Sequence, residues 1–567
     1  MHSTSVARTL RYNDVRNRST HYVHALLAIF KVLCKMLPWK THPLFALSAS
    51  ITNIPLPCHF PHFCMCGIIA VSGFRDVIQD LYDGLIMLQH RGQDAAGIIT
   101  YNSQFHLKKA NGMVRDVFHQ KSLERLRGTM GIGHVRYPTA GCSSEFEAQP
   151  FFISTPFGIA LAHNGNLTNT PELRTFLTEK EYRHLNTNSD SEILLNMFSV
   201  ALRNQRPKGK LAPEHVFGAV SNVFRRCKGA YSAVALIGGQ GILGFRDPYG
   251  IRPLQLGKRK YGMKEEYIIA SENTAFKALE FEFIRDVRPG EAIFIDRQNR
   301  LHSKQIRKGQ LSPCIFEWVY LAAPDSTLDG VNVYKARVRM GEYLADQIKK
   351  ANIKIDTVIP VPDTGRPVAA GLASKLKIRY REGLIKNRYI MRTFIMPGQQ
   401  LRKRSLHFKL HPIELEFKDK NVLLVDDSIV RGNTSQKIVE LVREAGARKV
   451  YFASAAPPIV CPDPYGIDLP TKQELIAANH SVEEIRKFIK ADGLFYGSIE
   501  DLHKSIQYGN KNITRFSEGC FTCRYPTPEV NIALLRKLGA ARNITRKNDP
   551  LNESDEGGDS TRMMTLV

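Results

Sequence analysis

The sequence predicts two domains of different fold class, an α+β layered sandwich followed by an α/β domain with a parallel sheet. The first prediction rests on residues 66 to about 300, where helical patches such as "SEILLNMFSVALRN" separate short β-type runs such as "CGIIAVSG" and "YSAVALIG". The second rests on residues from about 310 to 510, where apolar runs end in acids and lead into helical patterns. Strand–loop–helix units of this kind place ligands at the carboxyl ends of parallel strands.

Length and composition are those of a large globular protein. The 567 residues are enough for two large domains with tails, and 43% of them are hydrophobic while 23% are charged. No run of about 18 uncharged apolar residues occurs, so we expect no membrane-spanning helix and no membrane partner. Ten cysteines over this length do not form the pattern of a disulfide framework. We therefore expect a reducing compartment, the cytoplasm.

The formal net charge of +25 indicates polyanionic partners, because 79 Lys and Arg face only 54 Asp and Glu. Nucleic acid and small phosphorylated substrates both fit such a surplus. The sequence has no signature of an RNA-recognition motif, a zinc finger or a helix-turn-helix. We therefore expect phosphorylated small molecules and no nucleic acid.

Both ends of the chain differ from the rest. Residues 1–65 hold seven Lys and Arg and one acid, and Lys31 and Lys35 break their apolar segment, so they fit neither a signal nor a transit peptide well. We expect this stretch to be a non-native extension, either translated from a wrong start or removed as a leader. Residues 511–540 read as a C-terminal extension, and the polar, aperiodic residues 541–567 as a disordered tail.

A candidate phosphate site lies in "NVLLVDDSIVRGNTS", residues 421–435. An apolar strand ends in Asp426 and Asp427, and a polar turn then leads into a helix. Acids at a strand end can hold ribose hydroxyls or a divalent cation, while the turn and the helix N-terminus offer N–H groups and hydroxyls to a phosphate. Helix capping alone explains Thr434 or Ser435. It does not explain two adjacent acids after a buried strand, because their burial without a ligand is costly.

This segment resembles the 5-phosphoribosyl-1-pyrophosphate (PRPP) motif of the type I phosphoribosyltransferases. The resemblance implies that Asp426 and Asp427 contact the ribose hydroxyls and Mg²⁺, and that the loop cradles the 5′-phosphate. The implied loop residues are Ser428, Arg431, Gly432, Asn433, Thr434 and Ser435, with Asn433 standing where the family usually has Thr. Upstream, "VIPVPDTG" resembles the family's pyrophosphate loop, which adds Thr364 to the metal site.

A candidate nucleophile is Cys66, in "HFCMCGIIAVSG". A thiol that attacks an amide needs a base, and one solution uses the nucleophile's own α-amine. An α-amine has a pKa near ~7.7–8.0 and is partly unprotonated at neutral pH, whereas a peptide nitrogen is no base. The chemistry therefore requires Cys66 to be the first residue of the working chain. Read alone, Cys66 is more typical of a small buried hydrophobe, the usual state of a free cysteine.

Four further stretches follow Cys66 in order: "LQHRGQDAAGI", "GIGHVRYPTAG", "LAHNGNLTN" and "NTNSDSE". Together they resemble the N-terminal-nucleophile glutamine amidotransferase domain, a four-layer sandwich. The resemblance implies that Arg136 pairs with the glutamine carboxylate and Asp190 with its ammonium. It also implies an oxyanion hole made by the Asn164 side-chain amide and the Gly165 backbone N–H.

The two halves together resemble the amidophosphoribosyltransferase family, from Cys66 to roughly residue 530. The implied reaction converts glutamine, PRPP and water to 5-phosphoribosylamine, glutamate and pyrophosphate, the first committed step of de novo purine (IMP) biosynthesis. The resemblance also implies purine nucleotides as feedback inhibitors, a homo-oligomer such as a tetramer, and a basic PRPP-closing loop at 386–405. Trp318 and Ala323 depart from the family's usual sequence. A catalytically altered PRPP-binding regulator and another glutamine amidotransferase remain the alternatives.

Some members of the family carry a [4Fe–4S] cluster, so the cysteines bear on the cofactor. Four thiolates suffice for a cluster, and the sequence offers Cys314, Cys461, Cys520 and Cys523. Their register is shifted, however. Cys520 matches one ligand of the cluster-bearing pattern, while Ser517 and Asp463 stand where two others belong. We therefore expect a protein without a cluster. The expected cofactor is the Mg²⁺ that the resemblance of the PRPP motif implies.

Overall fold

Two stacked sheets form the first half of the chain in the computed structural model, which describes residues 66–136, 147–206, 211–387, 410–467 and 469–537. All of these belong to one compact unit, His59–Val567. The first sheet has the order β11-β9-β10-β1-β4-β2-β3 and the second β13-β12-β8-β7-β6-β5. The neighbouring strands of both sheets run antiparallel.

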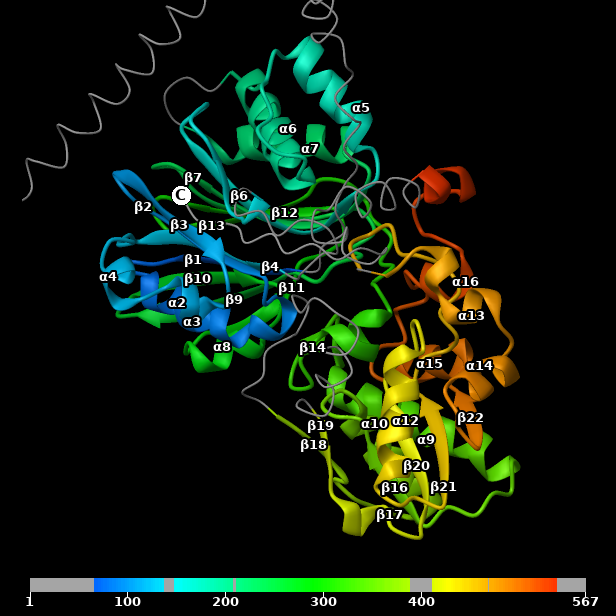
Figure 1. The fold of residues 1–567 in the computed structure, drawn as a ribbon. Coiled ribbons are helices and arrows are strands. Elements are labelled where there is room, and N and C mark those ends of the chain that lie inside the picture. The colour runs from blue at the N-terminus through cyan, green and yellow to red at the C-terminus, as the bar shows by residue number, and fades with distance from the viewer. Residues whose placement is uncertain (1–65, 137–146, 207–210, 388–409, 468, 538–567) are drawn as a thin grey trace, which may run out of the picture. The chain divides into compact units, whose positions relative to one another are not determined.

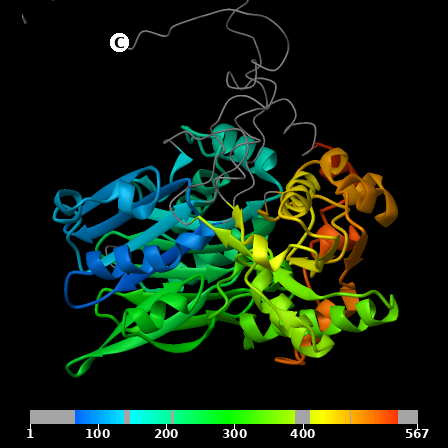
Figure 2. The same cartoon turned by 60° about the horizontal axis from the view of Figure 1, so that its bottom comes forward.

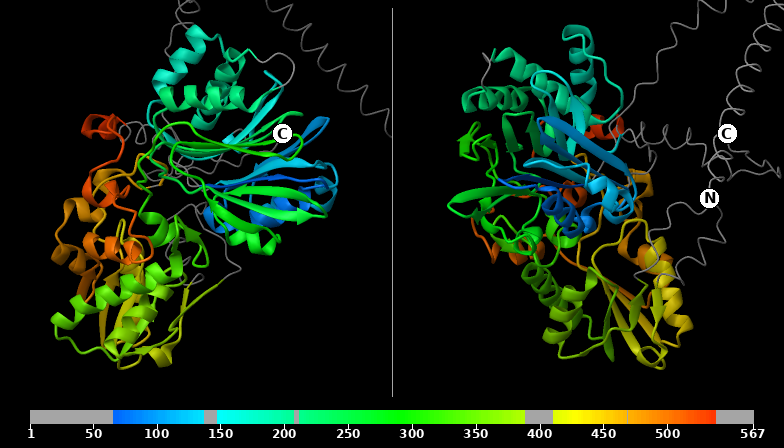
Figure 3. Two further views of the ribbon diagram at one scale, coloured as in Figure 1. Left: turned by 180° about the vertical axis from the view of Figure 1, so that it is seen from behind. Right: turned by 90° about the vertical axis from the view of Figure 1, so that its left-hand side faces the viewer.

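The strands of the first sheet are β1 (Cys66–Ser72), β2 (Ala95–Asn102), β3 (Gln104–Asn111), β4 (Met130–Arg136), β9 (Gln255–Tyr261), β10 (Lys264–Ala270) and β11 (Glu282–Asp286). Those of the second are β5 (Phe151–Ile153), β6 (Ile159–Leu167), β7 (Gly229–Ile237), β8 (Gly241–Arg246), β12 (Glu291–Asp296) and β13 (Leu301–Gln305). Helices α2 (Ile78–Met87), α3 (Val114–Val117) and α8 (Thr274–Ala278) cover the first sheet, and α6 (Asp190–Asn204) and α7 (Pro213–Arg226) the second (Figures 1 and 3).

The alternation of side chains along β1 shows why this strand is apolar throughout. Ile69 and Val71 pack against α2 and α8, while Ile68 and Ala70 point to the opposite face and into the core between the two sheets. Successive side chains of a strand point to opposite faces, so a strand covered on both sides needs apolar residues at every position. The helix–sheet–sheet–helix layers confirm the predicted four-layer α+β sandwich.

Smaller elements complete this half. They are η3 (Gln89–Arg91), α4 (Gln120–Leu123), α5 (Thr170–Thr175) and the π-helical turn η5 (Phe176–Lys180). A second π-helical turn, η6 (Glu317–Leu321), and the hairpin β14 (Thr327–Leu328)–β15 (Val331–Asn332) lead into the second half. Trp318 of η6, which departs from the family's usual sequence, is fully buried and donates its indole N–H to Val331 O at 3.3 Å. The fold therefore accommodates the indole ring at this position.

A parallel sheet organises the second half, as predicted. Its order is β17-β16-β20-β21-β22, and every neighbouring pair is parallel. The strands are β16 (Thr357–Pro360), β17 (Arg379–Tyr380), β20 (Asn421–Asp426), β21 (Lys449–Ser454) and β22 (Gly493–Tyr496). The chain order reverses between β16 and β20, and the carboxyl ends of strands at such a switch point form the usual ligand crevice of an open α/β sheet.

Helices cover both faces of this sheet (Figures 1 and 2). Helices α9 (Val333–Lys350) and α10 (Gly365–Leu376) pack on one face, against side chains that include Leu423 and Val425 of β20. Helices α12 (Asn433–Glu444) and α14 (Val482–Phe488) pack on the other, with Val422 and Leu424. The remaining elements are β18 (Leu384–Lys386), β19 (Leu410–Pro412), η7 (Glu414–Glu416), η8 (Lys472–Glu474), α13 (Ile476–Asn479), α15 (Ile499–Gln507) and α16 (Gly519–Thr522).

Several sequence-based predictions concern residues outside the described ones. These are the extension 1–65, most of the basic loop 386–405, and the tail 541–567. Within the described part of the chain, no helix is both long and apolar enough to cross a membrane.

Candidate active sites

Cys66 is the first residue of β1 and is almost completely buried. In the antiparallel ladder it pairs with Arg136, the last residue of β4, and Arg136 in turn pairs with Ala95 of β2. The backbone N–H of Cys66 donates to the side-chain oxygen of Asn164 at 3.3 Å. The candidate nucleophile thus lies beside two of its predicted partners. Strand register places Arg136 next to it in the first sheet, and a hydrogen bond joins it to Asn164 in the second.

Asn164 and Gly165 lie next to each other on β6 of the second sheet. Asn164 is fully buried, and while its Oδ1 accepts from Cys66, its Nδ2 has no hydrogen-bond partner. Gly165 has φ +141°, and a Cβ at this position would lie 2.0 Å from Ala230 O of β7. Only glycine therefore fits here, and a buried amide donor remains beside Cys66 without an acceptor.

Arg136 and Asp190 face one pocket, which Gly165 also lines. The Arg136 guanidinium donates to Glu147 at 2.9 Å and lies 3.7 Å from Asp94. Asp190 is in the first turn of α6, where the helix N-terminus favours a carboxylate, and its Oδ2 accepts from Leu167 N at 3.0 Å. A buried cation at the end of β4 and a buried anion at the start of α6 suit the two ends of an amino acid.

Sequence reasoning missed the other residues that line this pocket, which are Glu147, Gln149, His163, Ser189 and Ser191. Nδ1 of His163 lies 2.7 Å from the Ser191 hydroxyl, and its Nε2 lies 3.5 Å from Asp190. Burial lowers the pKa of His163, although the charge of Asp190 partly offsets it. His163 precedes Asn164 directly in the stretch "LAHNGNLTN", which was the one available signal for it.

The candidate PRPP site sits at the switch point of the parallel sheet. Asp426 ends β20, Asp427 follows it, and Thr364 stands in the loop after β16. The Thr364 hydroxyl donates to Asp427 Oδ2, and the Ser428 hydroxyl donates to Oδ1 at 2.6 Å. Gly365 packs so tightly on β20 that a Cβ would lie 2.4 Å from Val425 O. Three predicted residues of the metal site are therefore adjacent.

The charged forms of the Asp426 and Asp427 carboxyls are unfavourable in this buried position. Burial, together with the neighbouring charge of Asp427, raises the pKa of Asp426 well above its usual range. Burial also raises the pKa of Asp427, although hydrogen bonds from Ser428 and Thr364 oppose it. A cation bound between the carboxylates would relieve both effects, and oxygen donors of this kind are the ligands that Mg²⁺ prefers.

The predicted phosphate loop runs from β20 into α12. Gly432 adopts the left-handed conformation at φ +78°, immediately before the first helical residue, Asn433. The first helical bond runs from Gln436 N to Gly432 O at 2.8 Å, so the N–H groups of residues 433–435 have no acceptor within the helix. Asn433 and Thr434 are exposed, and Arg431 pairs with Glu474 at 3.1 Å. Helix termini of this form bind anions.

The four cysteines considered for a cluster lie around one buried region. Cys461 and Cys523 form a disulfide with their Cα atoms 5.5 Å apart, and Cys314 and Cys520 are buried thiols. Burial raises the pKa of Cys314 to about 12. Within the described ranges, no group of three or more His, Cys, Asp or Glu side chains is arranged to hold a metal ion.

Two family models match the chain. Residues 134–278 match a glutamine amidotransferase domain, and residues 332–463 match a phosphoribosyl transferase domain. The two domains define the class, which is a glutamine-dependent phosphoribosyltransferase.

Relatives define the family within that class. The chain is 53% identical over 491 residues to the amidophosphoribosyltransferase of Pseudomonas aeruginosa, covering 85% of this chain and 97% of the relative. It is 51% identical over 499 residues to the amidophosphoribosyltransferase of Escherichia coli, covering 86% and 99%. The glutamine PRPP amidotransferase of B. subtilis, solved in complex with ADP and GMP, superposes with a TM-score of 0.72 at 37% identity, covering 82% of this chain and 98% of that one. This chain belongs to the amidophosphoribosyltransferase family.

Proposed function

We propose that this chain converts glutamine, PRPP and water to 5-phosphoribosylamine, glutamate and pyrophosphate, with the two half-reactions at the two sites described above. The observation that carries the glutamine half is Asn164, whose buried side-chain amide has no acceptor beside Cys66. An unsatisfied buried donor costs roughly 1–3 kcal/mol. A developing oxyanion would supply the missing acceptor.

In the glutamine half-reaction, Cys66 attacks the side-chain amide of glutamine. Its own α-amine takes the thiol proton and passes it to the departing ammonia, and the resulting thioester is hydrolysed to glutamate. The Asn164 amide and the Gly165 N–H stabilise the tetrahedral intermediates. Arg136 and Asp190 hold the carboxylate and the ammonium of the substrate. This mechanism requires that the working chain begin at Cys66, with residues 1–65 absent or removed.

In the second half-reaction, Asp426, Asp427 and Thr364 hold PRPP through its ribose and pyrophosphate. The residues of the phosphate loop, from Ser428 to Ser435, bind the 5′-phosphate. Bound Mg²⁺ would neutralise charge on the leaving pyrophosphate. The adjacent buried carboxyls with raised pKa values fit such a cation, since it would remove their mutual repulsion.

Ammonia from the first site must reach the second without protonation in bulk water. We propose that a shielded path forms between the sites when PRPP is bound. The loop predicted to close over PRPP lies mostly outside the described residues.

We further propose purine nucleotides as feedback inhibitors, in line with the B. subtilis relative solved with ADP and GMP. A homo-oligomer in the cytoplasm completes the proposal. The unpaired thiols of Cys227, Cys314 and Cys520 support a reducing compartment, while the Cys461–Cys523 disulfide weighs against it.

The starting residue tests the glutamine mechanism. Two forms of the protein, one beginning at Cys66 and one verified by mass to retain residues 1–65, are assayed for glutamine-dependent and ammonia-dependent synthesis. We expect both forms to use ammonia and only the first to use glutamine. Full glutamine-dependent activity in the longer form would exclude the amine of Cys66 as the base.

A further inference from the structure

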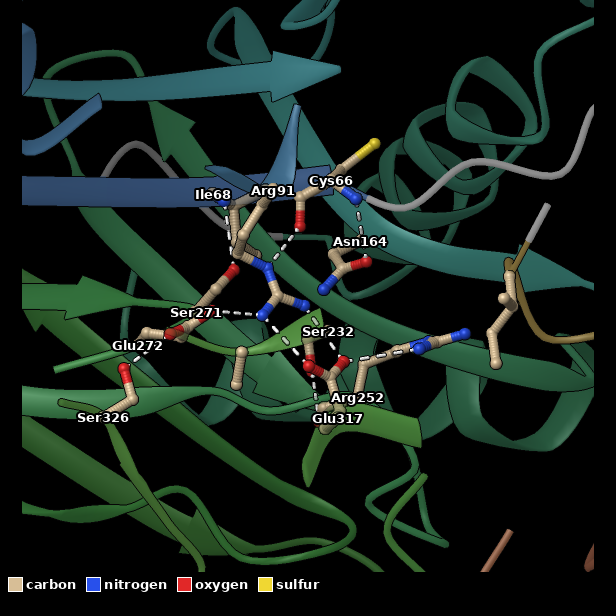
Figure 4. A network of polar contacts seen from close by, with 12 residues as sticks. Cys66, Ile68, Arg91, Asn164, Ser232, Arg252, Ser271, Glu272, Glu317 and Ser326 are labelled. Atoms are coloured by element: carbon tan, nitrogen blue, oxygen red, sulfur yellow. Dashed lines mark hydrogen bonds and ion pairs between the residues drawn. The ribbon is translucent and has the colours of Figure 1, made fainter. Parts of the chain in front are cut away.

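A buried cluster of four charged side chains lies behind Cys66, on the side away from the thiol (Figure 4). The cluster consists of Arg91, Arg252, Glu272 and Glu317, each at most 2% exposed. Two cations and two anions balance within it. The proposed reaction has no direct use for any of the four.

Arg91 connects this cluster to the nucleophile. Its Nε donates to the carbonyl oxygen of Cys66 at 3.0 Å. Its two terminal nitrogens donate to the two carboxylate oxygens of Glu317, both at 3.0 Å, and one of them also donates to Glu272. A bidentate pair of this geometry fixes the guanidinium in orientation as well as in position. Glu317 therefore determines where Arg91 holds Cys66.

The pKa values of Arg91 and Glu272 are shifted in the directions that favour their charged forms. Burial alone would lower the pKa of Arg91, but the charges of Glu317 and Glu272 outweigh it and raise the pKa. Burial would likewise raise the pKa of Glu272, yet His90 and Arg91 lower it. Removing one partner would strand a buried charge, so the geometry of each member depends on the others.

Glu317 does not belong to the sandwich that carries Cys66. It begins the π-helical turn η6, in the stretch that leads into the phosphoribosyltransferase half, and π-helical turns are frequent at functional sites. Arg337 of α9 holds the same turn by donating to Trp318 O at 2.8 Å and to Ala322 O at 2.9 Å. Arg252 donates to the Glu317 carboxylate at 3.3 Å. It also donates, at 2.9 Å, to Tyr465 O in the loop after β21.

We propose that Arg91 and Glu317 are positioning residues for Cys66, because Glu317 fixes the Arg91 guanidinium and Arg91 holds the carbonyl oxygen of the nucleophile. This inference rests on the proposed function. It assigns the placement of Cys66 to a single buried set of contacts, Cys66 O–Arg91–Glu317, backed by the bonds from Arg337 to η6.

The test compares Glu317→Gln with a matched control, Asp329→Asn. Asp329 also follows the sandwich and accepts a bidentate pair from a buried arginine, Arg246, at 2.8 and 2.9 Å, but it does not touch the Cys66 cluster. Both variants are made in the full chain. The measured quantities are the kcat and KM of glutamine hydrolysis with and without PRPP, ammonia-dependent synthesis, and the melting temperature.

We expect Glu317→Gln to lower the PRPP-stimulated kcat of glutamine hydrolysis by about 10- to 100-fold, because small misplacements of reacting groups have effects of that size. The KM for glutamine and ammonia-dependent synthesis should change by less than about threefold, the level at which uniform binding is retained. Asp329→Asn should lower the melting temperature and keep the kcat of glutamine hydrolysis.

An equal loss of glutaminase kcat in both variants would overturn the inference, since the cluster would then act only by holding the halves together. An unchanged kcat in Glu317→Gln would overturn it as well. If Glu317→Gln does not fold, Arg91→Lys replaces it, because lysine keeps the charge opposite Glu317 but lacks the third nitrogen that reaches Cys66 O. The same loss of kcat is then expected, and an unchanged kcat would again refute the proposal. Failure of the unmodified chain to couple glutamine to PRPP would count against the proposed function instead.

Discussion

Replacing Asn164 by alanine separates catalysis from stability more sharply than other changes in the glutamine site. In the proposed mechanism, the Asn164 amide donates to the oxyanion, and loss of one such donor lowers kcat by about 10²–10³, or roughly 2.7–4 kcal/mol of transition-state stabilisation. The KM for glutamine should change little, because Arg136 and Asp190 remain. Ammonia-dependent synthesis should be unaffected.

The expected change in stability is small, and this follows from the contacts of Asn164. The substitution removes one hydrogen bond, from Cys66 N at 3.3 Å, which contributes about 0.5–1.5 kcal/mol. It also removes a buried amide nitrogen without a partner, which costs the folded state about 1–3 kcal/mol. The two effects oppose each other, and the largest loss exceeds the smallest relief by about 0.5 kcal/mol, so the free energy of unfolding should fall by no more than about 0.5 kcal/mol.

The assay measures glutamate release, ammonia-dependent synthesis and urea denaturation on Asn164→Ala, with Asn166→Ala as the control. Asn166 lies two residues further along β6 and also has one buried side-chain atom without a partner, but its Nδ2 donates to both Pro464 O at 2.9 Å and Leu167 O at 3.3 Å. Its loss removes one more hydrogen bond than the loss of Asn164, so it should destabilise the protein more and lower kcat less. The oxyanion-hole argument is refuted if Asn164→Ala keeps its kcat within about threefold, or if it loses both activities together.

Five other outcomes are expected. Cys66→Ala should abolish glutamine-dependent synthesis and leave ammonia-dependent synthesis, as measured with each nitrogen source; loss of both in a folded variant would contradict separate sites. Asp426→Asn with Asp427→Asn should abolish PRPP use in a pyrophosphate-release assay while basal glutaminase survives. Since the pKa values of both carboxyls are raised on folding, the folded state binds more protons than the unfolded one, and stability is lost as pH rises from about 4 through the raised values; the double variant should lack this loss in pH-dependent denaturation. Breaking the Cys461–Cys523 disulfide, by reductant or by Cys461→Ser, should lower the free energy of unfolding by about 2–4 kcal/mol, and iron analysis of anaerobically purified protein should find no stoichiometric iron.

Local stretches of sequence were enough to predict which candidate residues are neighbours. Asn164 and Gly165 are consecutive on one strand, and Asp426 and Asp427 end one apolar run, so adjacency in sequence already places them together in space. The parallel sheet was predictable for the same reason, because its apolar strands end in acids and lead into helices.

Contacts between distant residues were not predictable. Arg91 and Glu317 are 226 residues apart, and nothing in either stretch shows that a buried carboxylate and guanidinium meet. Glu147 pairs with Arg136 from a position 11 residues further along the chain, and nothing in the sequence shows that these two side chains meet. The Cys461–Cys523 disulfide joins residues 62 apart, and cysteine spacing alone does not say which thiols pair. The order of strands at the switch point was also not predictable from the sequence, because a hydrophobic pattern shows which face of a strand is buried and not which strands lie beside it.

The stoichiometry of products tests the central claim most directly, namely that one chain uses ammonia from glutamine at Cys66 to displace pyrophosphate at Asp426 and Asp427. Glutamate and pyrophosphate are measured together from glutamine, PRPP and Mg²⁺, with the protein beginning at Cys66. We predict equal amounts of the two products and no pyrophosphate when glutamine and ammonia are both omitted. Glutamate formed without matching pyrophosphate, or pyrophosphate formed without a nitrogen source, would contradict the account.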